Sequence, residues 1–248
     1  IASFSGDFDG GGHAVENLLV SEGTERAGFF GRLQGIDAAA DSAADAVSVH
    51  DFGVASGSVT GLHTVGGITG DMMRLQGKAA VRVERCWNAA SVTGTGANSK
   101  SETMAGGIVG YALGTVSNCY NTGSVSAAAR YAGGIAGSTT GVSSYTRVES
   151  CYNTGSVTAS SLAGAINGWH RNSTSPTTNC YYLDNGLPAF GTDGESGQAT
   201  KLTSDQLKSW AVPYALNNSH FGTEGMTWTL DGENTNGGYP VFGASLRG

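Results

Sequence analysis

Apolar residues recur in three short patterns that repeat along most of the chain. One pattern places a cysteine three residues after a valine and directly before an aromatic residue; the second is Ser-Val-Thr, and the third is Gly-Gly-Ile-x-Gly. Alternation of inward apolar and outward polar side chains over such short stretches is typical of β-strands. We therefore expect three short strands in each repeat.

The cysteine pattern sets the period of the repeat. Cys86, Cys119, Cys151 and Cys180 lie 33, 32 and 29 residues apart, and two of them begin the same stretch, Cys-Tyr-Asn-Thr-Gly-Ser-Val. A near-constant period of this length is typical of proteins built from stacked repeats. One earlier repeat lacks a cysteine, and there we expect Gly53-Val54-Ala55 to take the Cys-aromatic-Asn places.

The last part of the chain breaks the period. Residues 184–200 have the composition of a loop, Thr203–Gln206 forms a capping box for a short helix, and Thr227–Leu230 has the pattern of a strand. Because an uncovered stack exposes strand edges, we expect this part to cover the open end of the repeats. The predicted division is β-solenoid repeats over residues 1–183 and a cap of loop, helix and strand over residues 184–248.

Composition supports short strands joined by tight turns. The chain of 248 residues contains 40 glycines, and only 13% of its residues are charged. Glycine supplies the positive φ angles of tight corners without steric cost, and a low charged fraction argues against disorder. Three stretches of variable length are expected to be insertions at corners: 37–46 as a loop or short helix, and 71–80 and 94–104 as loops.

Charge and hydropathy exclude two kinds of partner. The net charge is −7 and no cluster of Lys or Arg is present, so nucleic acid is not an expected partner. No apolar run reaches the ~18 residues that a membrane-spanning helix needs, so membrane insertion is not expected. The chain begins at Ile1 without a signal peptide, and we interpret it as a piece of a longer protein.

The cysteines have two interpretations. In a stack they would form a column with neighbours about 5 Å apart, which is close enough for disulfide bonds. The alternatives are two disulfides, or four buried thiols that act as small apolar side chains. We favour the thiol column, which does not fix the redox compartment.

Several motifs taken together resemble those of a known family. They are the entry unit Gly-Asp-Phe-Asp-Gly-Gly-Gly-His, the Gly-Phe-Phe-Gly and Gly-Gly-Ile-x-Gly strands, the Cys-Tyr-Asn-x-Gly-x-Val strands and the Tyr-Pro-Val ending. Over residues 4–242 the chain resembles bacterial surface proteins with GLUG-type repeats. The resemblance implies a right-handed parallel β-helix, of about six coils here, on a secreted or wall-attached protein. Such repeats occur in adhesin-like proteins, beside immunoglobulin-A-cleaving zinc metallopeptidases and in some secreted carbohydrate-active enzymes.

No catalytic residue is assigned. The sequence has no His-Glu-x-x-His, no Gly-x-Ser-x-Gly and no phosphate-binding loop. Paired carboxylates are the alternative for a polysaccharide enzyme, because glycosidases need two of them about 5 to 10 Å apart. The candidates are Asp7 with Asp9 on one extended stretch, and Glu84 with Glu149 at equivalent places two repeats apart; we favour solvated acidic positions for both pairs.

No metal site or cofactor is assigned either. The five histidines are dispersed and show no ligand spacing. Oxygen-rich loops at Asp184-Asn185, 193–195 and 231–234 would suit calcium, but none contains a complete calcium-binding motif.

The aromatic residue after each cysteine provides the candidate binding site. If the neighbouring Cys and Asn point inward, alternation directs these rings outward. A row of rings about 5 Å apart can stack on the faces of sugars. Alternatively, the rings pack on one another or on a neighbouring insertion. The candidate binding residues are Trp87, Tyr120, Tyr152 and Tyr181.

Three functions remain open. The leading hypothesis is a non-catalytic extracellular module of a bacterial surface protein that presents a binding face to host or environmental glycans or surface proteins. The second is a secreted carbohydrate-active enzyme, a polysaccharide hydrolase or lyase, with a carboxylate site on one face of the solenoid. The third is a purely structural spacer. The missing catalytic motifs favour a protein without enzymatic activity, and all three hypotheses place it outside the cell or on the cell wall.

Overall fold

The computed structural model describes most of the chain. The described residues are 1–21, 23–35, 46–74, 79–96, 103–139, 146–170, 176–192, 198–219 and 227–243. Most of the corner insertion expected at 37–46, and the central parts of those expected at 71–80 and 94–104, lie outside these residues.

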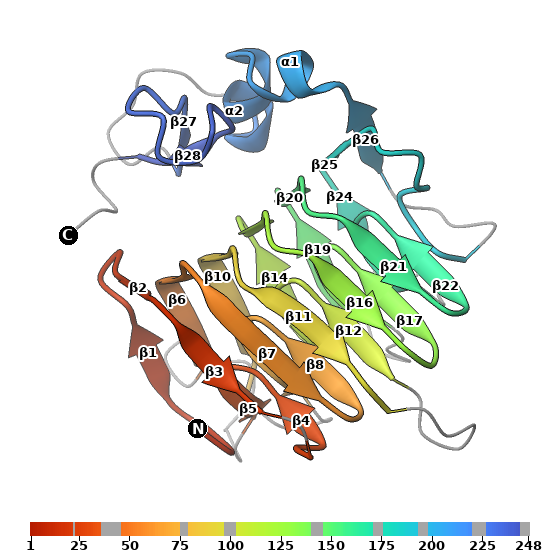
Figure 1. The fold of residues 1–248 in the computed structure, drawn as a ribbon. Coiled ribbons are helices and arrows are strands. Elements are labelled where there is room, and N and C mark those ends of the chain that lie inside the picture. Colours follow the sequence, from red (N-terminus) through yellow and green to blue (C-terminus); the bar gives the residue numbers. More distant parts are fainter. Residues whose placement is uncertain are drawn as a thin grey trace.

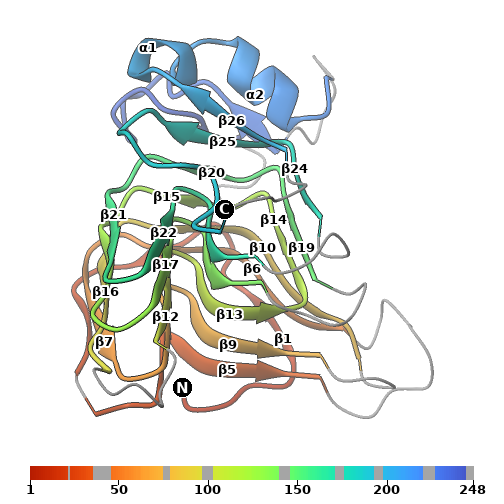
Figure 2. The ribbon, with the colours of Figure 1, turned by 90° about the vertical axis from the view of Figure 1, so that its right-hand side faces the viewer.

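Within the described residues the regular structure is mostly β-strand, in four parallel sheets that the chain visits in the same order in each repeat (Figure 1). Each pass runs from sheet 1 through sheets 2, 3 and 4 and then returns to sheet 1. Figure 2 shows strands of sheet 4 (β5, β9 and β13) lying one above another. The predicted all-β class and the stacking of repeats are therefore confirmed.

Sheet 1 consists of β1 (Asp7–Asp9), β2 (Ala14–Val15), β6 (Val47–Val54), β10 (Val81–Asn88), β14 (Thr115–Ser117), β15 (Tyr120–Asn121), β19 (Arg147–Glu149), β20 (Tyr152–Asn153), β24 (Thr177–Thr178), β25 (Cys180–Leu183) and β26 (Ala199–Leu202). Sheet 2 consists of β3 (Leu18–Val20), β7 (Gly57–Gly61), β11 (Ser91–Gly94), β16 (Val125–Ala127) and β21 (Val157–Ala159). Sheet 3 consists of β4 (Arg26–Ala27), β8 (Thr64–Gly66), β12 (Met104–Gly106), β17 (Tyr131–Gly133) and β22 (Leu162–Gly164). Sheet 4 consists of β5 (Phe30–Gln34), β9 (Thr69–Met73), β13 (Val109–Leu113), β18 (Ala136–Ser138) and β23 (Asn167–Trp169).

The Gly-Gly-Ile-x-Gly pattern forms a corner rather than one strand. In one complete copy, β12 ends at Gly106 and β13 begins at Val109, so Gly107 and Ile108 make the turn between sheets 3 and 4. Gly107 must lack a side chain, because a β-carbon there would collide with the Gly134 carbonyl of the next repeat. The expectation of three strands per repeat was therefore wrong, and the chain has a fourth strand at this corner.

The register of the repeat without a cysteine differs from the expected one by a single residue. Phe52 pairs with Cys86, Gly53 with Trp87 and Val54 with Asn88. The expected assignment began at Gly53. The reason is that Phe52 takes the inward cysteine place, where its ring lies 4.7 Å from that of Phe29, inside an aromatic cluster at the N-terminal end of the core.

The core is a stack of equivalent apolar side chains. One buried cluster contains the cysteines, the corner isoleucines and the valines of sheet 1. All four cysteines are free and buried, so the thiol column is the arrangement found. Burial raises the pKa values of Cys119, Cys151 and Cys180 well above the ordinary thiol value.

A buried ladder of asparagines runs beside the thiols. Asn88 Nδ2 donates to Asn121 Oδ1 at 2.9 Å, and Asn121 Nδ2 donates to Asn153 Oδ1 at 2.8 Å. Each of these amides also donates to the carbonyl two residues further along its own chain, as Asn121 does to Gly123 at 2.8 Å. These bonds satisfy polar groups that would be costly to bury alone.

The C-terminal unit (residues 203–243) packs along the flank of the repeats. It contains α1 (Ser204–Leu207), α2 (Ala211–Leu216) and the antiparallel pair β27 (Trp228–Thr229) and β28 (Val241–Phe242). The predicted capping box at α1 is present, with bonds between Thr203 and Gln206 in both directions.

The expected position of this unit was wrong in part. The segments just before the unit do extend the end of the stack, as expected: the Ile166 amide donates to the Ala189 carbonyl, Asn167 forms a parallel bridge with Phe190, and β26 pairs with β25. The helices and the β27–β28 pair instead lie beside sheet 1 (Figure 1). There they cover apolar rings that project from this flank.

Candidate functional site

The four predicted binding residues form one column on the outer face of sheet 1. Trp87 and Tyr120 stack with ring centroids 5.7 Å apart, and Tyr120 and Tyr152 stack at 5.1 Å. Tyr181 follows by backbone register with Tyr152. The rings project away from the core of the repeats, as alternation predicts.

The C-terminal unit covers the middle of this aromatic column. Tyr152 is fully buried and Tyr120 is only 6% exposed, because both pack against Trp228, and Tyr120 also against Phe242. The Tyr152 hydroxyl donates to the Pro240 carbonyl at 2.5 Å. The structure therefore does not contain an open row of four exposed rings. The binding role of the rings stays a prediction, and the rings that remain partly accessible are Trp87 and Tyr181, at the two ends of the column.

A second column of residues lies at the corner just before the cysteine place. Its backbone is left-handed in every repeat from the second onward, with φ between 48° and 52°. Its members are Asp51, Arg85, Asn118, Ser150 and Asn179. The later members hold the C-terminal unit, since Asn118 accepts a bond from Trp228 Nε1 and Asn179 donates to the Ala215 carbonyl. The first two members, Asp51 and Arg85, bond to each other instead.

A cavity of about 580 Å³ lies where the C-terminal unit meets the N-terminal part of the aromatic column. It combines aromatic surface with polar groups. Its lining includes Arg85, Trp87, Tyr120, Thr122, Asn236 and Tyr239. Pockets that bind small molecules typically have this mixture of apolar walls and a few fixed polar groups.

Trp87 reaches the cavity because Gly53 has no side chain. The indole lies across Gly53, and a β-carbon there would collide with it. Trp87 remains partly accessible, whereas Tyr120 and Tyr152 are buried under the C-terminal unit. Tyr181, at the other end of the column, is also partly accessible but does not line the cavity.

An ion pair fixes the polar edge of the cavity. Arg85 Nε and Nη2 donate to the two carboxylate oxygens of Asp51, both at 2.7 Å. Burial alone would raise the pKa of Asp51, but hydrogen bonds from Arg85 and His50 outweigh it and lower that pKa. Asp51 is therefore ionised at neutral pH, and Arg85 is held in one orientation.

The opposite wall of the cavity is a loop organised by Asp231. The Asp231 carboxylate accepts bonds from the backbone amides of Thr235, Asn236 and Gly238 at 2.7 to 2.9 Å. Desolvation raises the pKa of this carboxyl, but these bonds outweigh it, so the net pKa is lowered. This loop is one of those considered for calcium, and its aspartate bonds to the loop's own backbone. In the second of those loops, Asp184 accepts a bond from the Gly186 amide and pairs with Lys201. The stretch 193–195 lies outside the described residues.

The candidate catalytic carboxylates lie on sheet 1. Asp7 and Asp9 flank His50 of the next repeat, and both are well exposed. Glu84 and Glu149 occupy one column with Ser117 between them, as expected. Glu84 is paired with Arg85 at 2.6 Å.

Sequence reasoning missed His50, Asp51 and Arg85. Asp51 and Arg85 occupy the corner place before the cysteine, and His50 pairs in register with Asp9 of the first repeat. The signal was available: aligning Phe8 with Val49 as inward residues would have set Asp9 beside His50.

Comparison with known proteins found one matching family motif and one similar fold. The family described as Glug, the GLUG motif, matches residues 101–126. No curated protein matches the chain at a significant level. A crystal structure from Bacteroides ovatus, a "putative immunoglobulin A1 protease", is similar with a TM-score of 0.66 and 22% identity, over 97% of this chain and 70% of that chain. None of the described helices is long and apolar enough to cross a membrane. The chain thus contains a GLUG motif within an all-β fold of parallel strands shared with that structure, in agreement with the resemblance seen in its sequence.

Proposed function

We propose that the chain is a non-catalytic extracellular module of a bacterial surface protein that binds a glycan in the cavity beside Trp87. The proposed architecture is a right-handed parallel β-helix of about six coils over residues 1–183, followed by a unit of loop, helices and strands over residues 184–248 that covers its end and its flank. Parallel strands joined by a crossover are right-handed in about 98% of cases, which supports that hand. The GLUG motif and the similar protease-like structure support a secreted or surface location.

The observation that carries the binding proposal is the partly accessible indole of Trp87 at the wall of a polar-edged cavity. Pyranose rings have one face formed by C–H groups, which packs on flat aromatic surfaces, and a rim of hydroxyls. Arg85, Thr122 and Asn236 supply donors and acceptors for that rim. Arg85 is already held by Asp51, so a ligand binds it without paying to order a long side chain.

An enzymatic role has less support at this place. A polysaccharide hydrolase needs one carboxyl whose pKa is raised so that it acts as a general acid. The carboxyl that lines the cavity, Asp51, has a lowered pKa and is bound by a guanidinium. Asp7 and Asp9 are exposed and lie against His50 rather than facing one another across a cleft.

The proposal is tested by screening the chain on a glycan array and measuring the best ligand by calorimetry. Trp87→Ala is expected to weaken binding at least tenfold, and Trp87→Phe less, because a smaller ring keeps part of the stacking surface. The matched control is Trp210→Ala, which removes an indole that is 60% exposed and lies outside the cavity. Its affinity should stay within twofold of the unmodified chain.

Two results would contradict the proposal. If no glycan binds at millimolar concentration, the chain is a spacer. If a glycan binds equally well to Trp87→Ala, to Trp87→Phe and to the unmodified chain, the cavity is not the binding site. Circular dichroism of each variant separates a lost contact from lost folding.

A further inference from the structure

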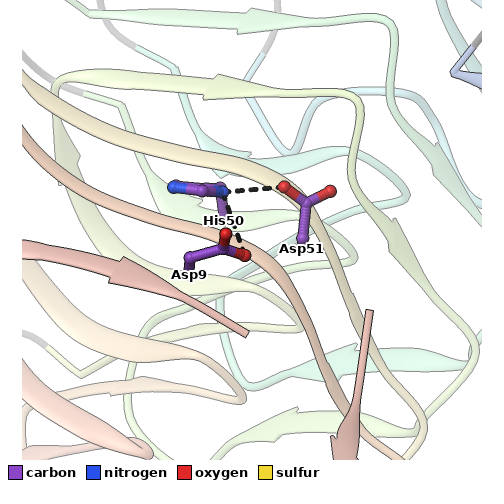
Figure 3. A group of neighbouring side chains, drawn as sticks. All are labelled: Asp9, His50 and Asp51. Atoms are coloured by element: carbon purple, nitrogen blue, oxygen red, sulfur yellow. Dashed lines mark hydrogen bonds and ion pairs between the residues drawn. The ribbon is translucent and has the colours of Figure 1, made fainter. Parts of the chain in front are cut away.

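Three acidic side chains surround His50 at the N-terminal end of sheet 1. Asp9 comes from β1, while His50 and Asp51 are neighbours on β6. Figure 3 shows the Asp9 and Asp51 carboxylates directed toward the same ring nitrogen of His50. Nδ1 lies 2.7 Å from Asp51 Oδ2 and 3.7 Å from Asp9 Oδ1.

The other ring nitrogen faces the third carboxylate. His50 Nε2 lies 3.3 Å from Asp7 Oδ1, which also accepts a bond from the Ser48 hydroxyl. A proton on Nε2 satisfies this contact and leaves the Nδ1 lone pair directed at two carboxylates. In this tautomer three acceptors converge on one point, an arrangement that a bound metal cation stabilises; in the other tautomer Nδ1 carries the proton and donates it to Asp51.

The charge around this point is unbalanced. Asp7, Asp9, Asp51 and Glu84 are carboxylates, and Arg85 is the cation that contacts two of them, Asp51 and Glu84. Among the described residues Arg85 forms no ion pair with Asp9, so excess negative charge remains beside His50.

We propose that His50 Nδ1 and the carboxylates of Asp9 and Asp51 form a site for a divalent transition-metal ion, with Zn²⁺ as the representative. Two ligands of a tetrahedral zinc ion lie ~3.3 Å apart when each bond is about 2.0 to 2.1 Å. The separations of 2.7 and 3.7 Å lie on either side of that value. A mixed nitrogen and oxygen set suits Zn²⁺, Ni²⁺ or Co²⁺ better than Ca²⁺ or Mg²⁺, which prefer oxygen alone.

The remaining contacts position these three ligands. Asp7 holds the imidazole ring in the way that carboxylates commonly orient metal-bound histidines. Arg85 fixes Asp51 through two bonds, and an ionised carboxylate has about four acceptor sites, so others remain for a metal. The Gly11 amide orients Asp9 with a bond of 2.8 Å. The site joins the first repeat to the second, since Asp9 pairs in register with His50.

The test is a calorimetric titration of ZnCl₂ into chelator-treated protein that carries no affinity tag. One Zn²⁺ should bind per chain and raise the melting temperature, because an ion that binds only the folded state stabilises it. His50→Gln and Asp9→Asn should each weaken binding at least tenfold. Asp7→Asn, which removes a positioning residue, should weaken it about tenfold. Titration with Co²⁺ should give a visible absorption band that His50→Gln loses.

Asp184→Asn is the matched control, because it removes an exposed aspartate that lies outside the cluster. Its zinc affinity should equal that of the unmodified chain. The proposal is overturned if the unmodified chain binds no stoichiometric zinc, or if His50→Gln and Asp9→Asn bind it unchanged. Circular dichroism in the presence of chelator checks that both variants fold. The Asp9 side chain is 63% exposed, so Asp9→Asn should fold and keeps the test valid even if His50→Gln unfolds.

Discussion

Trp228 Nε1 donates a hydrogen bond of 3.1 Å to Asn118 Oδ1, which joins residues 110 positions apart. Trp228 is fully buried, and it packs on both Tyr120 and Tyr152. This one side chain therefore ties the C-terminal unit to two successive rings of the aromatic column and to the corner two residues before Tyr120.

Trp228→Ala is expected to detach the C-terminal unit. Loss of a buried tryptophan typically costs about 3–5 kcal/mol. Limited proteolysis should then cleave within residues 203–243 while the repeats stay resistant. Asn118→Gly, which keeps a residue that tolerates the φ of 51°, should lower stability by about 1 kcal/mol through the lost acceptor.

The control for this prediction is Trp210→Ala, at an indole 60% exposed. It should leave the proteolysis pattern unchanged. Equal protease resistance of Trp228→Ala and the unmodified chain would show that the unit is held by other contacts.

Asn121→Ala should destabilise the repeats through the asparagine ladder. Asn121 accepts from Asn88 and donates to Asn153 and to the Gly123 carbonyl, and all of these groups are buried. Removing it takes one bond from each neighbouring amide, which keep their bonds to Ala90 and Gly155, and one from the buried Gly123 carbonyl, so the expected loss is about 3 kcal/mol. Urea unfolding followed by circular dichroism measures it.

Ser124→Ala in the same repeat is the matched control, because Ser124 is exposed. Its unfolding midpoint should be unchanged. If the two variants unfold at the same urea concentration, the ladder contributes nothing measurable.

Gly53→Ala should displace Trp87 from the cavity wall. An added β-carbon would collide with the indole, so either the ring or the strand must move. The expected result is weaker glycan binding and a shift in tryptophan fluorescence. Gly232→Ala, where a β-carbon would meet nothing within 4 Å, should change neither quantity.

The C-terminal loop should lose stability in acid through Asp231. The pKa of Asp231 is lowered in the folded state, so its stabilising contribution is complete at pH values above the pKa in the unfolded state, about 3.9. The contribution disappears as the pH falls through the folded pKa. Asp231→Asn should therefore lower stability at pH 6 but bring little change at pH 2, as urea unfolding at the two pH values would show. Asp184→Asn should not show this difference between the two pH values. If it does, the effect comes from the loss of any negative charge rather than from the bonds of Asp231.

The stack and its register were predictable because equal spacing leaves one consistent pairing. Once Cys119 and Cys151 pair as equivalents, Val125 must meet Val157 and Asn121 must meet Asn153. Prediction failed where a different residue took an equivalent role. Phe52 replaces cysteine as the inward side chain, and the chemistry of the two residues gives no common pattern to align.

The candidate sites were less predictable because they depend on contacts between distant segments. The aromatic column was identified from its spacing, but nothing local indicated that Trp228 would cover Tyr120 and Tyr152. His50 looked isolated in sequence, and its neighbour Asp9 is supplied by the preceding repeat. Such groupings become visible only when repeats are aligned by their inward residues.

The attachment of the C-terminal unit limits how this protein can change its length in evolution. A simple solenoid gains or loses whole repeats with little penalty, because each contacts only its neighbours. Here the unit bonds at once to Asn118, Tyr152 and Asn179, which belong to three successive repeats. Duplication or deletion among these repeats would put the docking points out of step, so length variation among relatives should concentrate on the N-terminal side of Trp87.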